Sequence, residues 1–149
     1  YKEFTKQDFS FLLNIAGKGP HKKKLIKTLK NISPKNFKYH GWVKNIDSFF
    51  DKIDILIVPS LFDSCPNLIF EGLQRNKIIF ANDIDSHKEI LKDKELIFSK
   101  KNIQELCIKI NKINYKKKYK NKILRKIIRA KKNSSFNWQK KFCEILIKC

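Results

Sequence analysis

The spacing of hydrophobic positions along this chain predicts where strands and helices alternate. Short apolar runs bounded by turn residues predict five strands, at residues 9–16, 37–40, 54–58, 78–81 and 96–98. Between these runs, apolar residues recur at three- and four-residue intervals, which predicts helices that begin near His21, Asn45, Asn67 and Ser86. This alternation predicts an α/β fold with a doubly wound parallel sheet.

The last third of the chain predicts helices only. Apolar residues keep to one helical face across residues 103–113 and again across residues 123–128, which is typical of packing helices. Residues 131–135 are polar and predict a break before a last helix. At 149 residues the chain has the length of one domain. We therefore expect a sheet domain over residues 1–132 and a separate terminal helix over residues 133–149.

The most informative segment is the turn after the third predicted strand. Residues 54–58 form a continuous apolar run, which predicts a strand buried on both faces, and Pro59 ends it. Asn67 is a residue type that caps helices, so we expect Glu71 one turn inside the next helix and Asp63 in the loop before it. Both carboxylates then lie at the carboxyl end of the strand, where open α/β sheets bind ligands.

The same turn is where the chain resembles a known family. Asp63 and Glu71, an acid and a glutamate separated by seven residues, resemble the signature of the GT-B retaining glycosyltransferases of family 4, also called group 1. Other segments are similar to the family's glycine loop, its nucleobase-side loop, its next strand and helix, and its closing helix, at residues 15–20, 37–43, 77–83, 89–91 and 136–138. The resemblance implies one half of a GT-B fold, a Rossmann-like domain that binds the nucleotide-sugar donor.

The resemblance implies a role for each acid. Glu71 would accept hydrogen bonds from both hydroxyls of the donor ribose, and Asp63, one methylene shorter than the glutamate more frequent in the family, would bind hydroxyls of the donor sugar. Each acid also has a plain structural interpretation, Glu71 as a surface residue favoured by the helix dipole and Asp63 as a turn-stabilising side chain. Backbone N–H groups between the acids are expected to point toward the sugar and phosphates, at Cys65, Asn67 and Leu68.

Two glycine-containing loops resemble the parts of the family's site that lie beside the donor. The first is expected to bring backbone and a lysine close to the phosphates, at Gly17, Lys18 and Gly19. The second is expected to read the base through its backbone, at Gly41, Trp42 and Val43. A plain turn for the first loop and a core or rim position for the tryptophan stay open as alternatives. The histidines are scattered, at His21, His40 and His87. No catalytic residue is assigned, because the resemblance implies that the histidine implicated in many relatives lies in the family's other domain.

The implied reaction transfers a hexose-type sugar from a UDP- or GDP-sugar to a glycan or lipid-linked acceptor, with retention at the anomeric carbon. Backbone amides and basic side chains would stabilise the charge that develops on the leaving diphosphate. Relatives generally need no metal, and the sequence contains no Asp-x-Asp motif, so we expect neither a metal nor a cofactor.

The four cysteines form no CxxC pair, so the sequence suggests neither a zinc site nor a disulfide framework. This usage favours a reducing cytoplasm as the location. Cys65 has no apparent histidine or asparagine arrangement to activate it, and we expect it to pack within the loop rather than act as a nucleophile.

The formal net charge of +20 has more than one interpretation. All but three of the 34 basic residues are lysines, whereas proteins that read bases and phosphates favour arginine, so we expect no specific nucleic-acid partner. The lysines are scattered among many asparagines and isoleucines, which is typical of the codon bias of an AT-rich genome. The alternative is a basic face against anionic lipid at the inner face of the membrane, with residues 116–118 and 131–132 as contacts.

The chain begins at Tyr1 and contains no methionine, so we expect a fragment of a longer protein. The resemblance implies that the acceptor-side domain is missing, together with the first donor-domain strand and its diphosphate-binding Arg and Lys. The isolated chain is then expected to be inactive. Two alternatives are another GT-B enzyme, such as a sugar-nucleotide 2-epimerase or a phosphorylase-like enzyme, and a non-catalytic basic binding module on a Rossmann-like scaffold.

Overall fold

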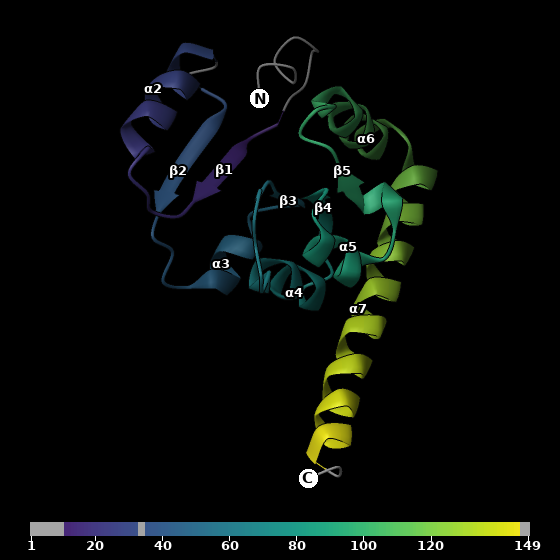
Figure 1. Ribbon diagram of the computed structural model, residues 1–149. Coiled ribbons are helices and arrows are strands. Elements are labelled where there is room, and N and C mark those ends of the chain that lie inside the picture. The colour runs from purple at the N-terminus through teal and green to yellow at the C-terminus, as the bar shows by residue number, and fades with distance from the viewer. Residues whose placement is uncertain (1–10, 33–34, 147–149) are drawn as a thin grey trace. The chain divides into compact units, whose positions relative to one another are not determined.

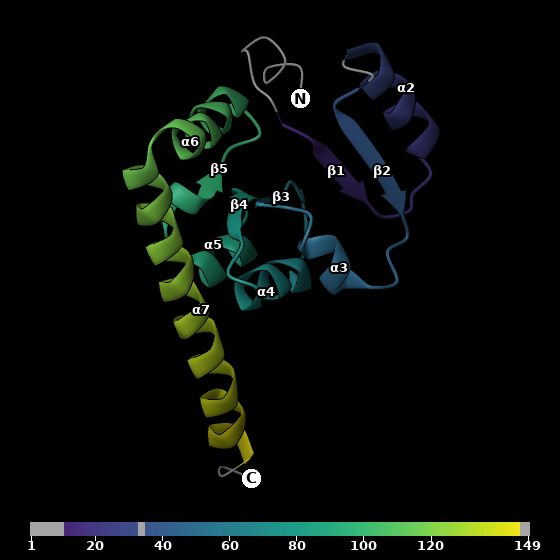
Figure 2. The ribbon, with the colours of Figure 1, turned by 180° about the vertical axis from the view of Figure 1, so that it is seen from behind.

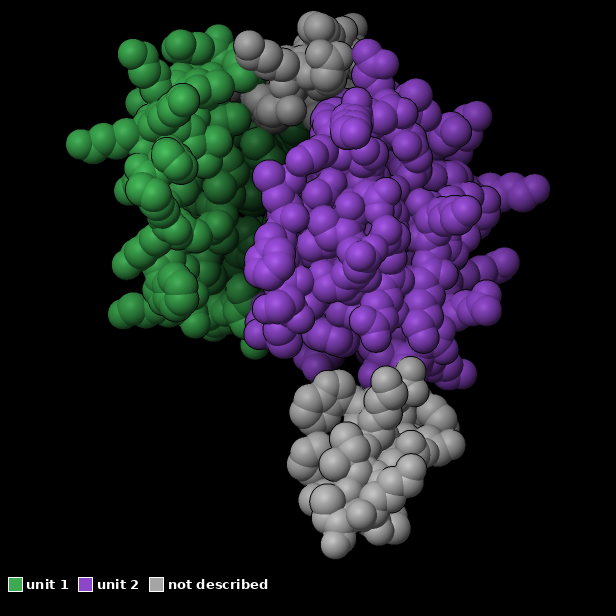
Figure 3. All heavy atoms as spheres, in the orientation of Figure 1, with its two compact units in different colours: residues 1–53 green, residues 54–149 purple. Residues whose placement is uncertain are grey.

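The computed structural model describes residues 11–32 and 35–146, with side chains as far as Ser134. The chain divides into two compact units, residues 1–53 and residues 54–149, coloured green and purple in Figure 3. Within the described residues each unit has its own parallel sheet, of two strands in the first unit and three in the second. Parallel strands that alternate with helices confirm the predicted α/β, Rossmann-like class.

The first unit contains a strand–helix–strand motif followed by a short helix (Figure 1). β1 (Leu13–Ala16) pairs in parallel with β2 (Phe37–Gly41), and α2 (Lys22–Ile32) connects them. Leu29 is the buried residue of α2. α3 (Ile46–Phe50) follows β2. The carboxyl ends of β1 and β2 therefore lie side by side at one edge of the unit, which brings the loops that follow them together.

Local sequence signals locate the elements of this unit well. The side-chain oxygen of Asn45 accepts a hydrogen bond from the backbone nitrogen of Ser48 at 3.0 Å, which confirms the predicted cap of α3. The first strand was predicted from residue 9, whereas β1 begins at Leu13. Residues 9 and 10 lie outside the described part of the chain.

The second unit is built around a three-stranded parallel sheet. Its strands follow the order β3 (Ile55–Val58), β4 (Ile78–Asn82), β5 (Ile97–Phe98). α4 (Asn67–Gln74) connects the first two strands, and α5 (Asp85–Leu91) with the short 3₁₀ helix η1 (Lys94–Leu96) connects the last two. The turn between β3 and α4 carries both predicted acids, so this unit positions the candidate site.

Burial differs between the two longer strands of this sheet. All five residues of β4 are buried, as expected for a central strand covered on both faces. β3 is buried only at Leu56 and Val58, while Ile55 and Ile57 are half-buried. The prediction that residues 54–58 are buried on both faces is therefore wrong for β3, because a continuous apolar run does not by itself distinguish a central strand from an outer one.

α6 (Ile103–Tyr115) and α7 (Lys117–Leu146) complete the second unit. α7 packs along α4, α5 and α6, and Figure 2 shows it passing beside these helices. Its buried residues recur at helical spacing, at Ile123, Ile127 and Ala130. One face of α7 therefore belongs to the core of the second unit.

The predicted helix break at residues 131–135 is wrong, because α7 continues through it. The segment contains neither Pro nor Gly, and its Asn and Ser residues lower helix propensity by less than about 1 kcal/mol each. The ammonium of Lys131 also donates hydrogen bonds to the carbonyl of Gln74 at 2.8 Å and to Oδ1 of Asn76 at 3.0 Å, which ties α7 to the end of α4. Packing of residues 133–149 on another domain stays a prediction, and the side chains of residues 136–138 lie outside those described.

Two ion pairs hold α7 against the turn that contains η1. Lys126 pairs with Asp93, and Lys122 pairs with Glu95. Burial by itself raises the pKa of Asp93, but hydrogen bonds from Lys126 and from the backbone of Glu95, with the positive charges of Lys126 and Lys122, outweigh it and hold the pKa below its usual value. The lowered pKa means that ionised Asp93 stabilises the fold.

This coupling predicts a pH dependence of stability. Because the pKa of Asp93 is lower in the folded than in the unfolded chain, its contribution is present above about pH 4 and is lost as the pH falls through the folded value. Lys126→Gln is expected to lower the free energy of unfolding by about 1 kcal/mol at pH 7 and by much less at pH 3. Urea unfolding of both proteins at the two pH values measures this difference, with Lys118→Gln, an exposed lysine, as control. A penalty that stays the same at pH 3 contradicts the prediction.

Candidate functional site

The turn from β3 to α4 carries one group of predicted site residues. The prediction that Asn67 caps α4 is wrong: Pro66 occupies the cap position, and Asn67 is the first helical residue. The backbone nitrogen of Asn67 donates to the carbonyl of Cys65 at 2.7 Å, and the nitrogen of Ile69 donates to the carbonyl of Pro66 at 2.9 Å. The helix therefore begins one residue earlier than the capping preference of asparagine suggests, because proline is readily accommodated beside a helix start.

Asp63 stabilises this turn. Its Oδ1 accepts a hydrogen bond from the backbone nitrogen of Cys65 at 3.1 Å, the geometry of an Asx turn. The other carboxylate oxygen, Oδ2, has no hydrogen-bond partner among the described residues. The structural interpretation of Asp63 is thus correct, and it leaves one oxygen of the half-buried side chain open to a ligand.

Glu71 lies in the second turn of α4, as predicted, and its side chain is half-buried. Its backbone carbonyl accepts from the guanidinium of Arg75 at 3.0 Å. Its carboxylate has neither a hydrogen bond nor an ion pair within the part of the chain that the structure describes. A partly desolvated carboxylate usually has a hydrogen-bond or ion-pair partner, so the carboxylate of Glu71 is available to accept hydrogen bonds from a bound molecule.

The backbone N–H groups between the acids are only partly available. The N–H of Cys65 is bound to Asp63 and that of Asn67 to the carbonyl of Cys65, so the prediction that both point toward a ligand is wrong. The tight turn uses them internally. The N–H of Leu68, in the first turn of α4, has no partner among the described residues. A helix start with a free N–H favours an anion at this position.

Asn82 is a positioning residue that the sequence analysis missed. It is the last residue of β4 and is buried. Its Nδ2 donates to the carbonyl of Ser60 at 3.0 Å, and its Oδ1 accepts from the backbone nitrogen of Lys100 at 3.2 Å. One side chain thereby fixes the segments that leave β3 and β5. The only available signal was a polar residue directly after an apolar strand.

Asn82→Ala is expected to lower the free energy of unfolding by about 1–3 kcal/mol, because it leaves the carbonyl of Ser60 and the amide of Lys100 without their partner. Asn82→Asp is expected to be at least as destabilising, since a carboxylate cannot donate to Ser60. Urea unfolding measures both, with Asn114→Ala on the exposed surface of α6 as control. Equal stabilities of Asn82→Ala and the control variant contradict the prediction.

A second group of predicted site residues lies in the first unit, at the ends of β1 and β2. Gly17 and Gly41 have φ values of 125° and 66°, which L side chains rarely adopt. The backbone nitrogen of Gly17 donates to the carbonyl of Gly41 at 2.7 Å, and the hydroxyl of Tyr39 donates to the carbonyl of Gly17 at 2.6 Å. These bonds join the two predicted loops into one rigid corner, and they use the N–H of Gly17 internally.

The remaining predicted residues surround this corner. Lys18 and Gly19 are exposed, Val43 is half-buried, and Trp42 is 68% exposed, so the core position considered for the tryptophan is wrong. The structure brings these residues together with Gly17 and Gly41 in the first unit, and it brings Asp63, Cys65, Asn67, Leu68 and Glu71 together in the second.

Two of the three histidines, His40 and His87, have structural contacts. Nε2 of His40 lies 2.8 Å from Oδ1 of Asn14, and the His40 ring packs edge-on against the ring of Phe49. Burial, followed by the charges of Lys38 and Lys52, lowers the pKa of His40, so the ring is neutral near pH 7. His87 is buried and donates from Nδ1 to the carbonyl of Asn82 at 2.9 Å. Neither histidine is presented as a general acid or base.

Within the described residues, no group of three or more His, Cys, Asp or Glu side chains is arranged to hold a metal ion. Over the same residues, no helix combines the length and the apolar character needed to cross a bilayer.

Comparison with known proteins relates both groups of predicted site residues to one family. A family model described as glycosyl transferases group 1 matches residues 2–114, which include the glycine corner, the turn with both acids, and Asn82. No curated protein matches the sequence. The match spans well over half of the chain and agrees with the resemblance carried by Asp63 and Glu71. The chain therefore belongs to the group 1 glycosyltransferase family.

Proposed function

We propose that this chain binds the donor of a retaining hexosyl transfer, a UDP- or GDP-sugar, and that the sugar passes to a glycan or lipid-linked acceptor. Membership of the group 1 glycosyltransferases supports glycosyl transfer as the general activity. The observation that carries the donor assignment is the half-buried carboxylate of Glu71, which lacks a partner among the described residues. The uracil or guanine base, the hexose and the glycan or lipid-linked acceptor are proposed in addition to this general activity.

The chemistry of Glu71 suits a ribose. Adjacent ribose hydroxyls present two donors on one side of a ring, and a carboxylate held on a helix accepts both with its two oxygens. The bound hydroxyls replace the water that Glu71 loses when the donor binds. A partner of this kind accounts for a carboxylate that no residue of the described chain neutralises.

The other polar groups of the turn are proposed to bind the sugar and the diphosphate of the donor. The open oxygen of Asp63 accepts a hydroxyl of the donor sugar, while its bonded oxygen keeps the turn in place. The N–H of Leu68 donates to the diphosphate from the start of α4. Cys65 and Asn67 use their N–H groups within the turn. Their exposed side chains, joined by a hydrogen bond from Sγ of Cys65 to Oδ1 of Asn67 at 3.5 Å, are proposed to lie beside the donor.

The glycine corner of the first unit is proposed to contact the base and the phosphates. The base is assigned to the backbone of Gly41, Trp42 and Val43. Lys18 supplies a positive charge toward the phosphates, and Gly19, which has no side chain, lets the backbone of the loop approach them closely. The N–H of Gly17 does not contribute, because it is bound to Gly41. Neither a metal nor a cofactor is part of the proposal.

The proposed rate enhancement comes from stabilising the leaving nucleoside diphosphate. Negative charge grows on the phosphate oxygen as the bond to the anomeric carbon breaks, and N–H donors and ammonium groups already in position stabilise that charge. The Leu68 amide and Lys18 are the groups assigned to this task. No catalytic acid or base is assigned on this chain.

Calorimetric titration tests the donor proposal. We expect a UDP- or GDP-hexose to bind with a Kd below about 1 mM, and the corresponding free hexose to bind too weakly to detect. UDP and GDP alone serve as controls that separate the nucleotide contribution from that of the sugar. Absence of binding by every nucleotide and nucleotide sugar contradicts the proposal and favours a non-catalytic binding module.

A location on the cytoplasmic side, with peripheral contact to an anionic membrane surface, is also proposed. Such contact fits a lipid-linked acceptor. Of the two lysine runs expected to make it, residues 131–132 are the weaker candidate, because the ammonium of Lys131 is bound to Gln74 and Asn76. Residues 116–118 are exposed at the junction of α6 and α7.

A further inference from the structure

The basic residues are most concentrated in the first unit, on α2. This helix has five lysines among eleven residues and no acidic residue. The sequence from Asp8 to Asp47 contains nine lysines between these two acids and no other Asp or Glu. A codon bias toward lysine would raise the overall charge, but it does not account for a long segment without any acid to balance it.

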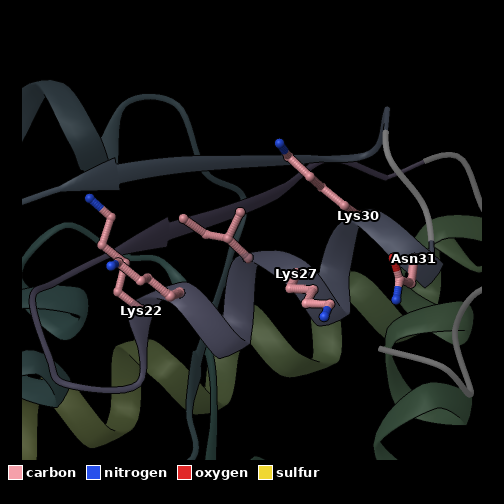
Figure 4. A pocket seen from close by; sticks show the side chains of 6 residues that line it. Lys22, Lys27, Lys30 and Asn31 are labelled. Atoms are coloured by element: carbon pink, nitrogen blue, oxygen red, sulfur yellow. The ribbon is translucent and has the colours of Figure 1, made fainter.

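The lysines of α2 surround a shallow hollow of about 390 Å³. Figure 4 shows its lining along α2, which consists of Lys22, Lys23, Ile26, Lys27, Lys30 and Asn31. These positions recur at helical spacing and lie on one side of the helix. Within the described residues none of these lysines forms an ion pair. We call the four lysines of this group the lysine face of α2.

The surroundings of the lysine face are amphipathic. Ile26 is half-buried within the hollow, and the neighbouring Leu25 is 40% exposed. Leu29 is buried and anchors α2 in the unit. Lysine side chains extend apolar stems along such a surface and keep their ammonium groups in the headgroup layer of a membrane.

We propose that the lysine face of α2 binds an anionic lipid surface. Lysine provides the point charges that negatively charged headgroups attract, each contributing about a fivefold increase in membrane binding. The first unit contains no arginine for bidentate phosphate recognition, and α2 contains no aromatic residue on which a base can stack, so nucleic acid fits this face less well. The inference names α2 as a contact for the peripheral membrane binding proposed above, on which it rests, and it is independent of the donor proposal, because it involves neither Glu71 nor the turn that contains it.

Vesicle co-sedimentation in the absence of any nucleotide tests the inference. We expect the wild-type chain to bind phosphatidylcholine vesicles that contain about one-third phosphatidylglycerol, and not vesicles of phosphatidylcholine alone. The triple variant Lys23→Gln, Lys27→Gln, Lys30→Gln is expected to bind the anionic vesicles about a hundredfold more weakly, at about fivefold for each lysine. Lys22 is left unchanged, because its ammonium lies over the ring of Tyr39, which holds the glycine corner.

The matched control is Lys94→Gln, Lys100→Gln, Lys101→Gln, which removes the same charge from exposed positions of the second unit that are assigned no membrane contact. Glutamine has nearly the helix propensity of lysine, and circular dichroism verifies that both variants fold. Retained vesicle binding by the control and loss by the α2 variant support the proposal. Equal losses overturn it in favour of diffuse attraction to the net charge. Duplex DNA that binds wild type more tightly than the anionic vesicles, and loses that binding in the α2 variant, overturns it in favour of nucleic acid.

Discussion

Glu71→Gln is expected to lower the affinity for a UDP- or GDP-hexose by about ten- to hundredfold. The substitution replaces a charged acceptor by a neutral amide, in which one of the two positions donates instead of accepting. The loss of hydrogen bonds to a charged group is worth about 1.5–3 kcal/mol, which corresponds to this change in Kd. Calorimetry on both proteins under identical conditions measures the difference. The fold is expected to be unaffected, because the carboxylate has no partner in the described chain.

A matched control and a modified ligand make this result specific. Asp51→Asn is the same conversion of carboxylate to amide at an exposed position at the end of α3, and it is expected to leave the affinity unchanged. A 2′-deoxyribose donor lacks one of the two proposed hydroxyls, so wild type is expected to bind it more weakly than the ribose donor. Glu71→Gln is expected to discriminate little between the two. If Glu71→Gln discriminates between the ribose and deoxyribose donors as strongly as wild type does, Glu71 does not bind the ribose.

Gly72→Val is expected to lower the free energy of unfolding by about 1–3 kcal/mol, with over-packing as the cause. A Cβ on Gly72 would lie 2.8 Å from Cδ2 of Leu56 and 3.0 Å from Cδ1 of Ile79. Both partners are buried side chains of the sheet, so they have little room to move. Glycine at this position lets α4 lie close to β3 and β4, and Glu71 is the adjacent residue of the same helix. Urea unfolding measures the loss.

Gly19→Ala is the control for this substitution, since a Cβ on Gly19 meets no atom within 4 Å. Its stability is expected to stay within about 0.5 kcal/mol of wild type. Combining Gly72→Ala with Leu56→Ala removes the closest contact. The double variant is expected to lose less than the sum of the two single losses. Strict additivity contradicts the close-packing explanation.

Much of the fold was predictable because its signals are local. Apolar runs located β2, β3 and β4 to within about two residues, and Asn45 identified the start of α3. Where the sequence was ambiguous, a contact with a distant segment determined the local structure. The polar residues 131–135 stay helical in α7, and Lys131 is held by the end of α4, which no local pattern reveals.

The candidate site was predictable in its residue types but not in its hydrogen bonds. The spacing of Asp63 and Glu71 located the turn correctly, whereas the internal use of the amides of Cys65 and Asn67 depends on the exact path of the backbone. The bond between Gly17 and Gly41 and the clamp made by Asn82 connect segments more than fifteen residues apart. Such contacts depend on the register of the sheets, which the sequence alone does not fix.

The proposed donor site includes an exposed thiol, and this makes a direct measurement possible. Cys65 lies in the turn between the two acids, while Cys107 is buried. Iodoacetamide labelling followed by mass spectrometry reports the alkylation rate of each cysteine-containing peptide, with and without the nucleotide sugar. A UDP- or GDP-hexose at ten times its Kd is predicted to slow alkylation of Cys65 by about tenfold in wild type, and at the same concentration by much less in Glu71→Gln. An unchanged Cys65 rate in a wild-type sample that calorimetry shows to be saturated with nucleotide sugar contradicts a donor site at this turn.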